Sequence, residues 1–241
     1  MIIIENASIK SILDNPAQWN SITKKNINND GGCIFRGLYS PEYIDQFKSW
    51  VFNSRLKKGL SDNIPYNKNT PNHFKIVDKD LDDSRPTRFL LHQYFPWNIR
   101  QNAEYQEFFI EFMKIRNVLN GFETDISITD IKDFVSWISV LQYRQCGDFL
   151  GAHKDRYSYQ AILIMSELGK DFQQGGQYYL HPEKGHVYSE RQFKKGDLVM
   201  LQSDIYHGVH PIDPFHNLSD NSISGRWIMF SPYHNSKIIQ E

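Results

Sequence analysis

The stretch KKGDLVMLQSDIYHGVHPI, residues 194–212, combines a Gly-Asp turn, a short apolar run and two closely spaced histidines. The apolar run, residues 197–203, has the length and the bounding turn residues of a buried β-strand. His207 and His210 follow this run directly. Histidines at the end of a buried strand are candidate metal ligands if a further ligand lies elsewhere in the chain.

Similar runs of β-branched and aromatic residues fill the second half of the chain. Clusters of Gly, Asp, Asn or Lys separate them, at a spacing typical of a β-sandwich or barrel, jelly rolls included. Apart from the run just quoted, they are FVSWISVLQY (134–143), YQAILIMS (159–166), GQYYLHP (176–182) and GRWIMFSPY (225–233). We therefore expect an α+β protein with a β core over about residues 131–236.

The first half, residues 1–130, shows helical patterns instead. Residues 40–59 offer Ser40 as an N-cap, and their apolar positions fall on one helical face. Residues 102–121 repeat this pattern and end at a glycine. Residues 60–84, rich in Asn, Asp, Lys and Pro, are expected to form a long surface loop. Residues 1–241 would then be one domain, with largely helical support and substrate-side loops before the core.

Composition and charge narrow the classes of function. The chain has 241 residues and a formal charge of −1, which gives no sign of a nucleic-acid or membrane partner. Its two cysteines, Cys33 and Cys146, match no paired metal or redox spacing. Neither a signal peptide nor an apolar run long enough to span a membrane is evident. We expect a soluble, cytoplasmic protein, whose oligomeric state the sequence does not predict.

A carboxylate lies upstream in LGAHKDRYSY, residues 150–159. His153 and Asp155 are two residues apart, so on a strand both side chains face the same side. Two histidines and one carboxylate form the facial triad of non-haem Fe(II) sites, which leaves coordination positions open for oxygen chemistry. The spacing alone leaves the choice between His207 and His210 open, and such patterns also arise by chance.

One arginine begins the last apolar run. Arg226 follows His207 by 19 residues, in GRWIMFSPY. A guanidinium in an apolar strand is costly unless it is paired, and its planar fork can bind a carboxylate with two hydrogen bonds. The alternative is an ordinary arginine in a salt bridge at a strand end.

In this order the motifs resemble the Fe(II)/2-oxoglutarate-dependent oxygenase superfamily, most closely its prolyl 4-hydroxylase-like branch. The match extends over about residues 142–233. It includes QYRQCGDFLGAHKD with its H-x-D, the Gly-Gly turn of QQGGQYYL, and the G-D, Ser and H-x-V-x-P positions of the stretch quoted first. The resemblance implies a double-stranded β-helix (jelly-roll) core with supporting N-terminal helices.

The resemblance also implies roles for particular residues. His153, Asp155 and His207 would be the catalytic iron ligands, and Arg226 would bind the distal carboxylate of 2-oxoglutarate, with Tyr143 as a nearby hydroxyl. The implied cofactor is Fe(II). The implied co-substrates are 2-oxoglutarate and O2, and ascorbate is an optional reductant.

The implied activity is that of a dioxygenase that hydroxylates an unactivated C–H bond and releases succinate and CO2. Asp155 favours hydroxylation over halogenation, because halogenating relatives lack this carboxylate; desaturation and cyclisation stay open. We expect a small, amino-acid-like substrate. The alternative is a peptidyl residue, as in a prolyl-type hydroxylase that acts on a protein or peptide.

Candidate substrate contacts are weaker. Arg85 and Arg88, in the segment 84–98, and Arg156, directly after the expected ligand, could meet a substrate carboxylate. Surface arginines beside a packed strand are the alternative for each. The segment 211–224, which is longer than usual for the branch, could border the active site.

Two other classes of protein remain as rivals. A cupin-like module would bind a metal without oxidative turnover, but cupins tend to have two histidines where this chain has His153 and Asp155. A zinc hydrolase with the same ligand types would need a general base beside a metal-bound water, and the sequence identifies none.

Overall fold

The protein is described by a computed structural model that covers residues 1–54, 66–67, 69–79, 85–122, 134–155, 159–217 and 222–235. The helices are α1 (Ile9–Asp14), α2 (Pro16–Asp30), α3 (Pro41–Asn53), α4 (Ile99–Asn102) and α5 (Gln106–Asn120), with a 3₁₀ turn η1 (Glu190–Gln192). The strands are β1 (Ile2–Ile4), β2 (Gly32–Phe35), β3 (His73–Lys79), β4 (Thr87–Tyr94), β5 (Phe134–Ser136), β6 (Ile138–Tyr143), β7 (Phe149–His153), β8 (Tyr159–Ile164), β9 (Gly176–His181), β10 (Gly185–Tyr188), β11 (Leu198–Gln202), β12 (His207–His210), β13 (Arg226–Phe230) and β14 (Tyr233–Asn235).

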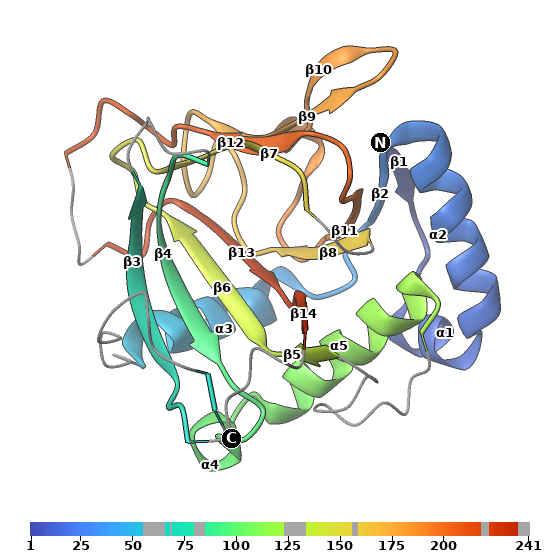
Figure 1. The fold of residues 1–241 in the computed structure, drawn as a ribbon, viewed down its shortest axis with the longest axis horizontal. Coiled ribbons are helices and arrows are strands. Elements are labelled where there is room, and N and C mark those ends of the chain that lie inside the picture. Colours follow the sequence, from blue (N-terminus) through green and yellow to red (C-terminus); the bar gives the residue numbers. More distant parts are fainter. Residues whose placement is uncertain are drawn as a thin grey trace.

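Most of these strands form one strongly curled sheet. Its order is β1-β2-β11-β8-β13-β6-β4-β7-β12-β9-β10, and β3 pairs with β4. One part of this sheet consists of β2, β11, β8, β13 and β6, and another of β7, β12, β9 and β10. The two parts lie over one another, and β4 pairs with β6 of the first part and β7 of the second (Figure 1). The expected α+β fold with a jelly-roll core is therefore confirmed.

The apolar runs of the central strands are buried on both faces. Ala161 and Leu163 of β8 pack into a cluster with the helices, whereas Ile162 and Ile164 belong to the cluster between the two parts of the sheet. Side chains alternate between the faces of a strand, so a run without polar residues is expected only where both faces are covered. This explains the continuous apolar stretch AILIM (161–165).

The helices cover the outer face of the sheet. Figure 1 shows α3 and α5 beneath it and α2 beside β1 and β2. The predicted N-cap is confirmed, because the Ser40 hydroxyl accepts a hydrogen bond from the Tyr43 amide. So is the glycine stop of α5, because Gly121 adopts a left-handed conformation. Among the described helices, none is long and apolar enough to cross a membrane.

One expectation about the first half is wrong. Residues 73–79, expected within a long surface loop, form strand β3, which pairs along its whole length with β4. The helices of this half are accompanied by further strands, because β1, β2 and β4 also join the sheet. The composition of residues 60–84 as a whole misled the prediction, because the few apolar residues of β3 lie in a segment rich in Asn, Asp and Lys.

The buried His92 provides a test of the core through pH. Burial lowers the pKa of its imidazole to about 4, and its ring stacks between Phe74 and Trp227. In the unfolded chain the His92 imidazole binds a proton near its ordinary pKa of 6.5, whereas in the folded protein it stays neutral down to about pH 4. The free energy of unfolding therefore falls as the pH drops from 6.5 towards 4. The shift corresponds to about 3 kcal/mol.

We expect His92→Phe, which cannot titrate, to have a clearly weaker pH dependence of stability than wild type. Urea unfolding between about pH 7 and pH 4.5 measures it. The exposed His216 supplies the control, because His216→Phe should leave the wild-type dependence unchanged. Identical slopes for His92→Phe and wild type would contradict the assignment.

Candidate metal and co-substrate site

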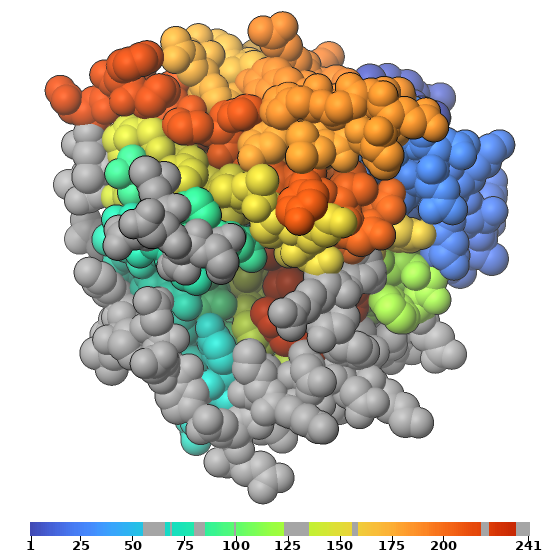
Figure 2. Space-filling model, turned by 45° about the horizontal axis from the view of Figure 1, so that its top comes forward, coloured from blue at the N-terminus to red at the C-terminus, as the bar shows by residue number. Residues whose placement is uncertain are grey.

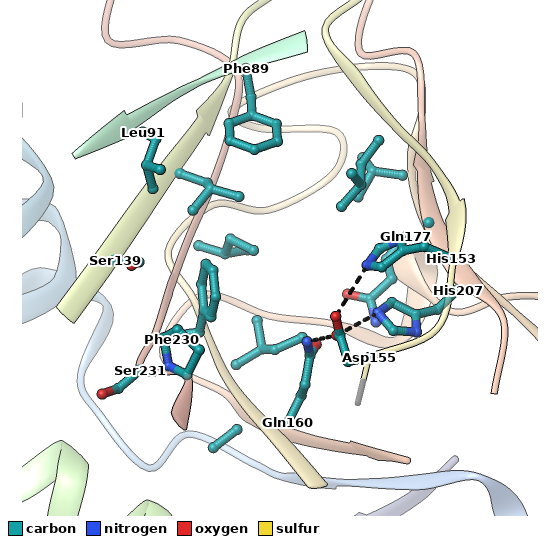
Figure 3. A pocket seen from close by; sticks show the side chains of 18 of the residues that line it. Phe89, Leu91, Ser139, His153, Asp155, Gln160, Gln177, His207, Phe230 and Ser231 are labelled. Atoms are coloured by element: carbon teal, nitrogen blue, oxygen red, sulfur yellow. Dashed lines mark hydrogen bonds and ion pairs between the residues drawn. The ribbon is translucent and has the colours of Figure 1, made fainter. Parts of the chain in front are cut away.

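Two histidines face each other across neighbouring strands. His153 ends β7, His207 begins β12, and the two residues are direct partners in the antiparallel register. Their ring centroids lie 4.3 Å apart. Directly opposed residues of an antiparallel pair project from the same face of the sheet, which here is the inner face, so both imidazoles enter the interior of the curled sheet (Figure 3).

Backbone contacts fix the orientation of both rings. Nδ1 of His153 lies 2.9 Å from the Gly151 carbonyl oxygen, and Nδ1 of His207 lies 3.0 Å from that of Ile205. A ring nitrogen that faces a carbonyl carries the hydrogen and donates it, so the other nitrogen, Nε2, keeps its lone pair. The buried Nε2 of His207 has no hydrogen-bond partner among the described residues.

Asp155 completes the cluster. Its carboxylate oxygens lie 3.7 Å from Nε2 of His153 and 3.3 Å from Nε2 of His207. The Asp155 amide donates to the Ser203 carbonyl at 2.7 Å, and the side-chain amide of Gln160 donates to the carboxylate. One ligand atom from each of the three residues lies within 4.8 Å of the others, a grouping able to hold a metal ion.

Electrostatics keep the cluster in the state that metal binding needs. Burial, together with the neighbouring His207 and Arg85, lowers the pKa of His153 to about 4, so its imidazole is neutral at pH 7. Burial opposes ionisation of Asp155, but the hydrogen bond and charge of a protonated His207, together with the charges of a protonated His153 and of the Arg85 guanidinium, outweigh it and hold its pKa below the usual range. Arg85 also donates from Nη2 to Nε2 of His153 at 2.9 Å.

The cluster opens into a cavity of about 580 Å³ between the two parts of the sheet. In Figure 2 the dark red C-terminal strands are visible at the bottom of a hollow beneath yellow and orange segments. Arg226 of β13 and Tyr143 of β6, direct partners in the sheet register, also line this cavity. Both side chains are fully buried, and the guanidinium lies 5.5 Å from the Tyr143 ring centroid.

Arg226 already has an acidic partner. Its Nε donates to Glu190 at 2.8 Å, and the side chains are 0% and 1% exposed. Its Nη2 donates to the side-chain oxygen of Gln177 at 3.2 Å. Three buried groups that line the cavity have no hydrogen-bond partner among the described residues: Nη1 of Arg226, the Tyr143 hydroxyl and Nε2 of Gln177. All three can donate, so together they fit a carboxylate.

The two glycines of the turn before β9 make room for the Glu190 side chain and for the Pro211 carbonyl. Gly176 has φ +118°, and a Cβ there would lie 2.3 Å from Cγ of Glu190. Gly175 has φ +87°, and a Cβ there would lie 2.1 Å from the Pro211 carbonyl oxygen. Glycine is therefore required twice over, for backbone conformation and for space.

The other candidates lie away from the cavity or outside the described residues. Arg88 donates to the fully buried Asp148 at 2.9 Å and does not line the cavity; a role at the substrate stays a prediction. Arg156 lies outside the described residues. His210, which the spacing left open, lies with its Nε2 3.2 Å from Nε2 of His186, away from the cluster.

The segment 211–224 is partly described. None of its described residues, 211–217 and 222–224, lines the cavity. Asp213 instead accepts hydrogen bonds from the amides of Gln173 and Gln174 and ties the segment to the turn before β9.

Sequence reasoning missed Gln160, Gln177 and Glu190. The two glutamines were visible as single polar residues inside the runs YQAILIM and GQYYL, where an amide on an inner strand face needs a partner. Glu190 had no such signal, because it lies in a short 3₁₀ turn and reaches Arg226 only in the folded chain.

Comparison with known proteins gives a fold but no close relative. No protein-family model matches the chain, and no curated protein sequence does. A prolyl-4-hydroxylase from Pseudomonas putida aligns with a TM-score of 0.51 and 11% identity over 90% of this chain and 98% of its own. An oxidoreductase of the 2OG-Fe(II) oxygenase family from Burkholderia pseudomallei aligns with 0.52 and 10% over 91% and 92%.

The dioxygenase for auxin oxidation 1 from Arabidopsis thaliana, solved with 2-oxoglutarate, has a TM-score of 0.55 and 12% identity over 96% of this chain and 91% of its own. The chain has the fold of the 2-oxoglutarate and Fe(II)-dependent oxygenases. At such identities the likeness concerns the fold, and this part of the expectation from the sequence motifs is confirmed.

The turn before β9 offers a test of the site's architecture. Gly176→Ala would force a side chain against Glu190, whereas at Gly169, also at positive φ (+86°), an added Cβ would have no other atom within 4 Å. We expect Gly176→Ala to lower the free energy of unfolding by about 2 kcal/mol more than Gly169→Ala, because only the former adds a clash. Urea unfolding compares them, and equal losses would mean that Glu190 moves aside freely.

Proposed function

We propose that this protein is a non-haem Fe(II)- and 2-oxoglutarate-dependent dioxygenase that hydroxylates an unactivated C–H bond. The observation that carries the proposal is that one cavity holds both a group of side chains able to hold a metal ion and a set of unpaired hydrogen-bond donors. One set is the cluster His153, Asp155 and His207; the other is the trio of donors on Arg226, Tyr143 and Gln177. The first set suits a metal with open positions, and the second suits a carboxylate.

The three metal ligands have distinct supports in the protein. Hydrogen bonds from Nδ1 to Gly151 and Ile205 hold the rings so that Nε2 of each histidine faces Asp155. Such outer contacts fix tautomer and orientation and raise the affinity of a site for its metal. When bound, iron would activate O2 for attack on a C–H bond while 2-oxoglutarate is converted to succinate and CO2.

The remaining residues would position the co-substrate and exclude water. Nη1 of Arg226, the Tyr143 hydroxyl and Nε2 of Gln177 would hold its distal carboxylate. Leu150, Val209 and Ile228, apolar residues that line the cavity, would keep water from the reacting centre. O2 and, as an optional reductant, ascorbate would complete the set of small molecules.

The cavity favours a small substrate, with amino-acid character as the working assignment. Its volume of about 580 Å³ lies in the range of small-molecule sites and has to accommodate the co-substrate as well. A peptidyl substrate is the second candidate, because one protein with the same fold is a prolyl-4-hydroxylase. A cupin-like binding module remains as the alternative without turnover.

The deciding experiment is an anaerobic titration of the purified protein with Fe(II) and 2-oxoglutarate, followed by visible absorption. A chelated 2-oxo acid on Fe(II) gives a weak charge-transfer band, which we expect here. Bound Fe(II) without such a band would favour the binding-module alternative. Succinate release under air then measures turnover.

The ligand assignment predicts the behaviour of two variants. His153→Ala and Asp155→Ala should abolish both the absorption band and succinate release, because each removes a ligand, and should leave the far-UV circular dichroism close to wild type. His210 lies outside the cluster, so His210→Ala should retain both the absorption band and succinate release. Wild-type turnover in either ligand variant would sink the assignment.

The role of Arg226 predicts a selective effect. Arg226→Ala should raise the concentration of 2-oxoglutarate needed for half-maximal turnover by about 10- to 100-fold, as expected for loss of a charged hydrogen bond. The requirement for Fe(II) should change little. Arg100→Ala is the control, since this arginine is exposed and lies outside the cavity. Small, equal changes in both requirements would identify Arg226 as a structural arginine.

A further inference from the structure

The end of the cavity that lies across from the metal cluster carries its own unsatisfied polar groups. Figure 3 shows Ser139 and Ser231 on the opposite side of the cavity from His153 and His207. Three buried atoms there have no hydrogen-bond partner in the described part of the chain. They are the indole Nε1 of Trp137, the side-chain oxygen of Gln93 and Nε2 of His234, and all three residues line the cavity.

Strand pairing and ring stacking bring these residues together. Gln93 of β4 is the direct partner of Ser139 of β6, and Trp137 precedes Ser139 by two residues. The His234 ring stacks on Trp137, with ring centroids 3.9 Å apart and an interplanar angle of 11°. The Tyr66 ring lies 4.9 Å from the same indole. The result is an aromatic chamber with polar groups in its wall.

Leaving such groups unpaired is expensive. A buried donor or acceptor without a partner has given up its hydrogen bonds to water and gained none in return. Gln93 and Trp137 are only 4% and 1% exposed, so water reaches them only through the cavity that they line. A ligand that pairs with them would recover this cost on binding.

The chemistry of the chamber points to an uncharged ligand group. Burial and the nearby Arg116 lower the pKa of His234 to about 4, so its imidazole is neutral at pH 7. Arg116 itself is directed at Ser136, Ser231 and Asn117 and does not line the cavity. The indole donates, whereas the Gln93 amide both donates and accepts. A carbonyl beside an N–H is the group that complements this set.

We propose that this chamber, Gln93, Trp137 and His234, binds a neutral carboxamide-type head group of the substrate: an amide, lactam or imide. The assignment names the substrate class of the dioxygenase proposed above and in that sense rests on it. The Gln93 amide pairs reciprocally with the head group, and the Trp137 N–H donates to its carbonyl. Apolar side chains of the cavity wall, among them Leu91 and Phe230, contact the apolar body of the substrate.

A carboxylate head is the competing possibility, because Lys75, Arg85 and Lys154 also line the cavity. Two of these cations are engaged elsewhere: Arg85 with His153, and Lys154 over the Tyr206 ring at 4.9 Å. Lys75 also has an interaction of its own. The test therefore compares an amide with the matching acid.

The probes are 3-phenylpropanamide, 3-phenylpropanoate and butylbenzene, which share a phenyl body and differ in the head. Each is titrated into full-length protein, both metal-free and with Zn(II) and 2-oxoglutarate, while the ¹⁵N-labelled indole resonance of Trp137 is followed. Trp137→Phe assigns that resonance. We expect a saturable shift with the amide at a concentration at least about tenfold below that needed for the acid. An unmoved resonance, or an equal or tighter affinity for the acid, would overturn the proposal.

Two isosteric variants separate recognition from folding. Gln93→Met should weaken amide binding, measured calorimetrically, about two- to tenfold, as expected for loss of a neutral hydrogen bond, and should leave butylbenzene binding unchanged. Gln101→Met, at an exposed position outside the cavity, should change neither. Equal weakening of both probes by Gln93→Met would overturn the role of its amide. The metal-free titration remains decisive even if the protein fails to turn over 2-oxoglutarate.

Discussion

The direct pairing of His153 with His207 is the contact on which the geometry of the site depends. A shift of one residue between β7 and β12 would turn one imidazole to the other face of the sheet and separate the ligands. β4 fixes the position of β7 relative to β6, because it pairs with β6 through Leu90 and with β7 through Thr87. The strand that carries Tyr143 and the strand that carries His153 are thereby held by one neighbour.

Much of this arrangement could be predicted from local patterns in the sequence. His153 and Asp155 are two residues apart, and strand geometry predicts that such side chains lie on one side. Apolar runs in the sequence indicate the strands near His207 and Arg226. The contact between Arg226 and Glu190 could not be predicted. It joins a strand to a short turn that lies 36 residues away in the sequence, and only the folded chain brings the two together. β3 was missed because its few apolar residues lie in a segment rich in Asn, Asp and Lys.

The buried Arg226–Glu190 pair explains how a guanidinium can be kept inside the sheet before any ligand arrives. Removing two charges from water is costly, and the cost is offset only where geometry is good and the remaining groups are satisfied. Glu190 meets this condition because its carboxylate also accepts a hydrogen bond from the backbone N–H of Gln177 at 2.6 Å. The arginine is thus prearranged, with one face held by protein and the other directed into the cavity.

The same pair changes the way acids are told apart. Because Glu190 balances the charge of Arg226, a dicarboxylic acid bound as proposed would meet a paired guanidinium at that end of the cavity. Under the proposed function, discrimination between dicarboxylic acids of different length would rest on whether both ends can be reached at once, one at the metal cluster and the other at the donors beside Tyr143. Selectivity in such a cavity would depend on the length of the acid.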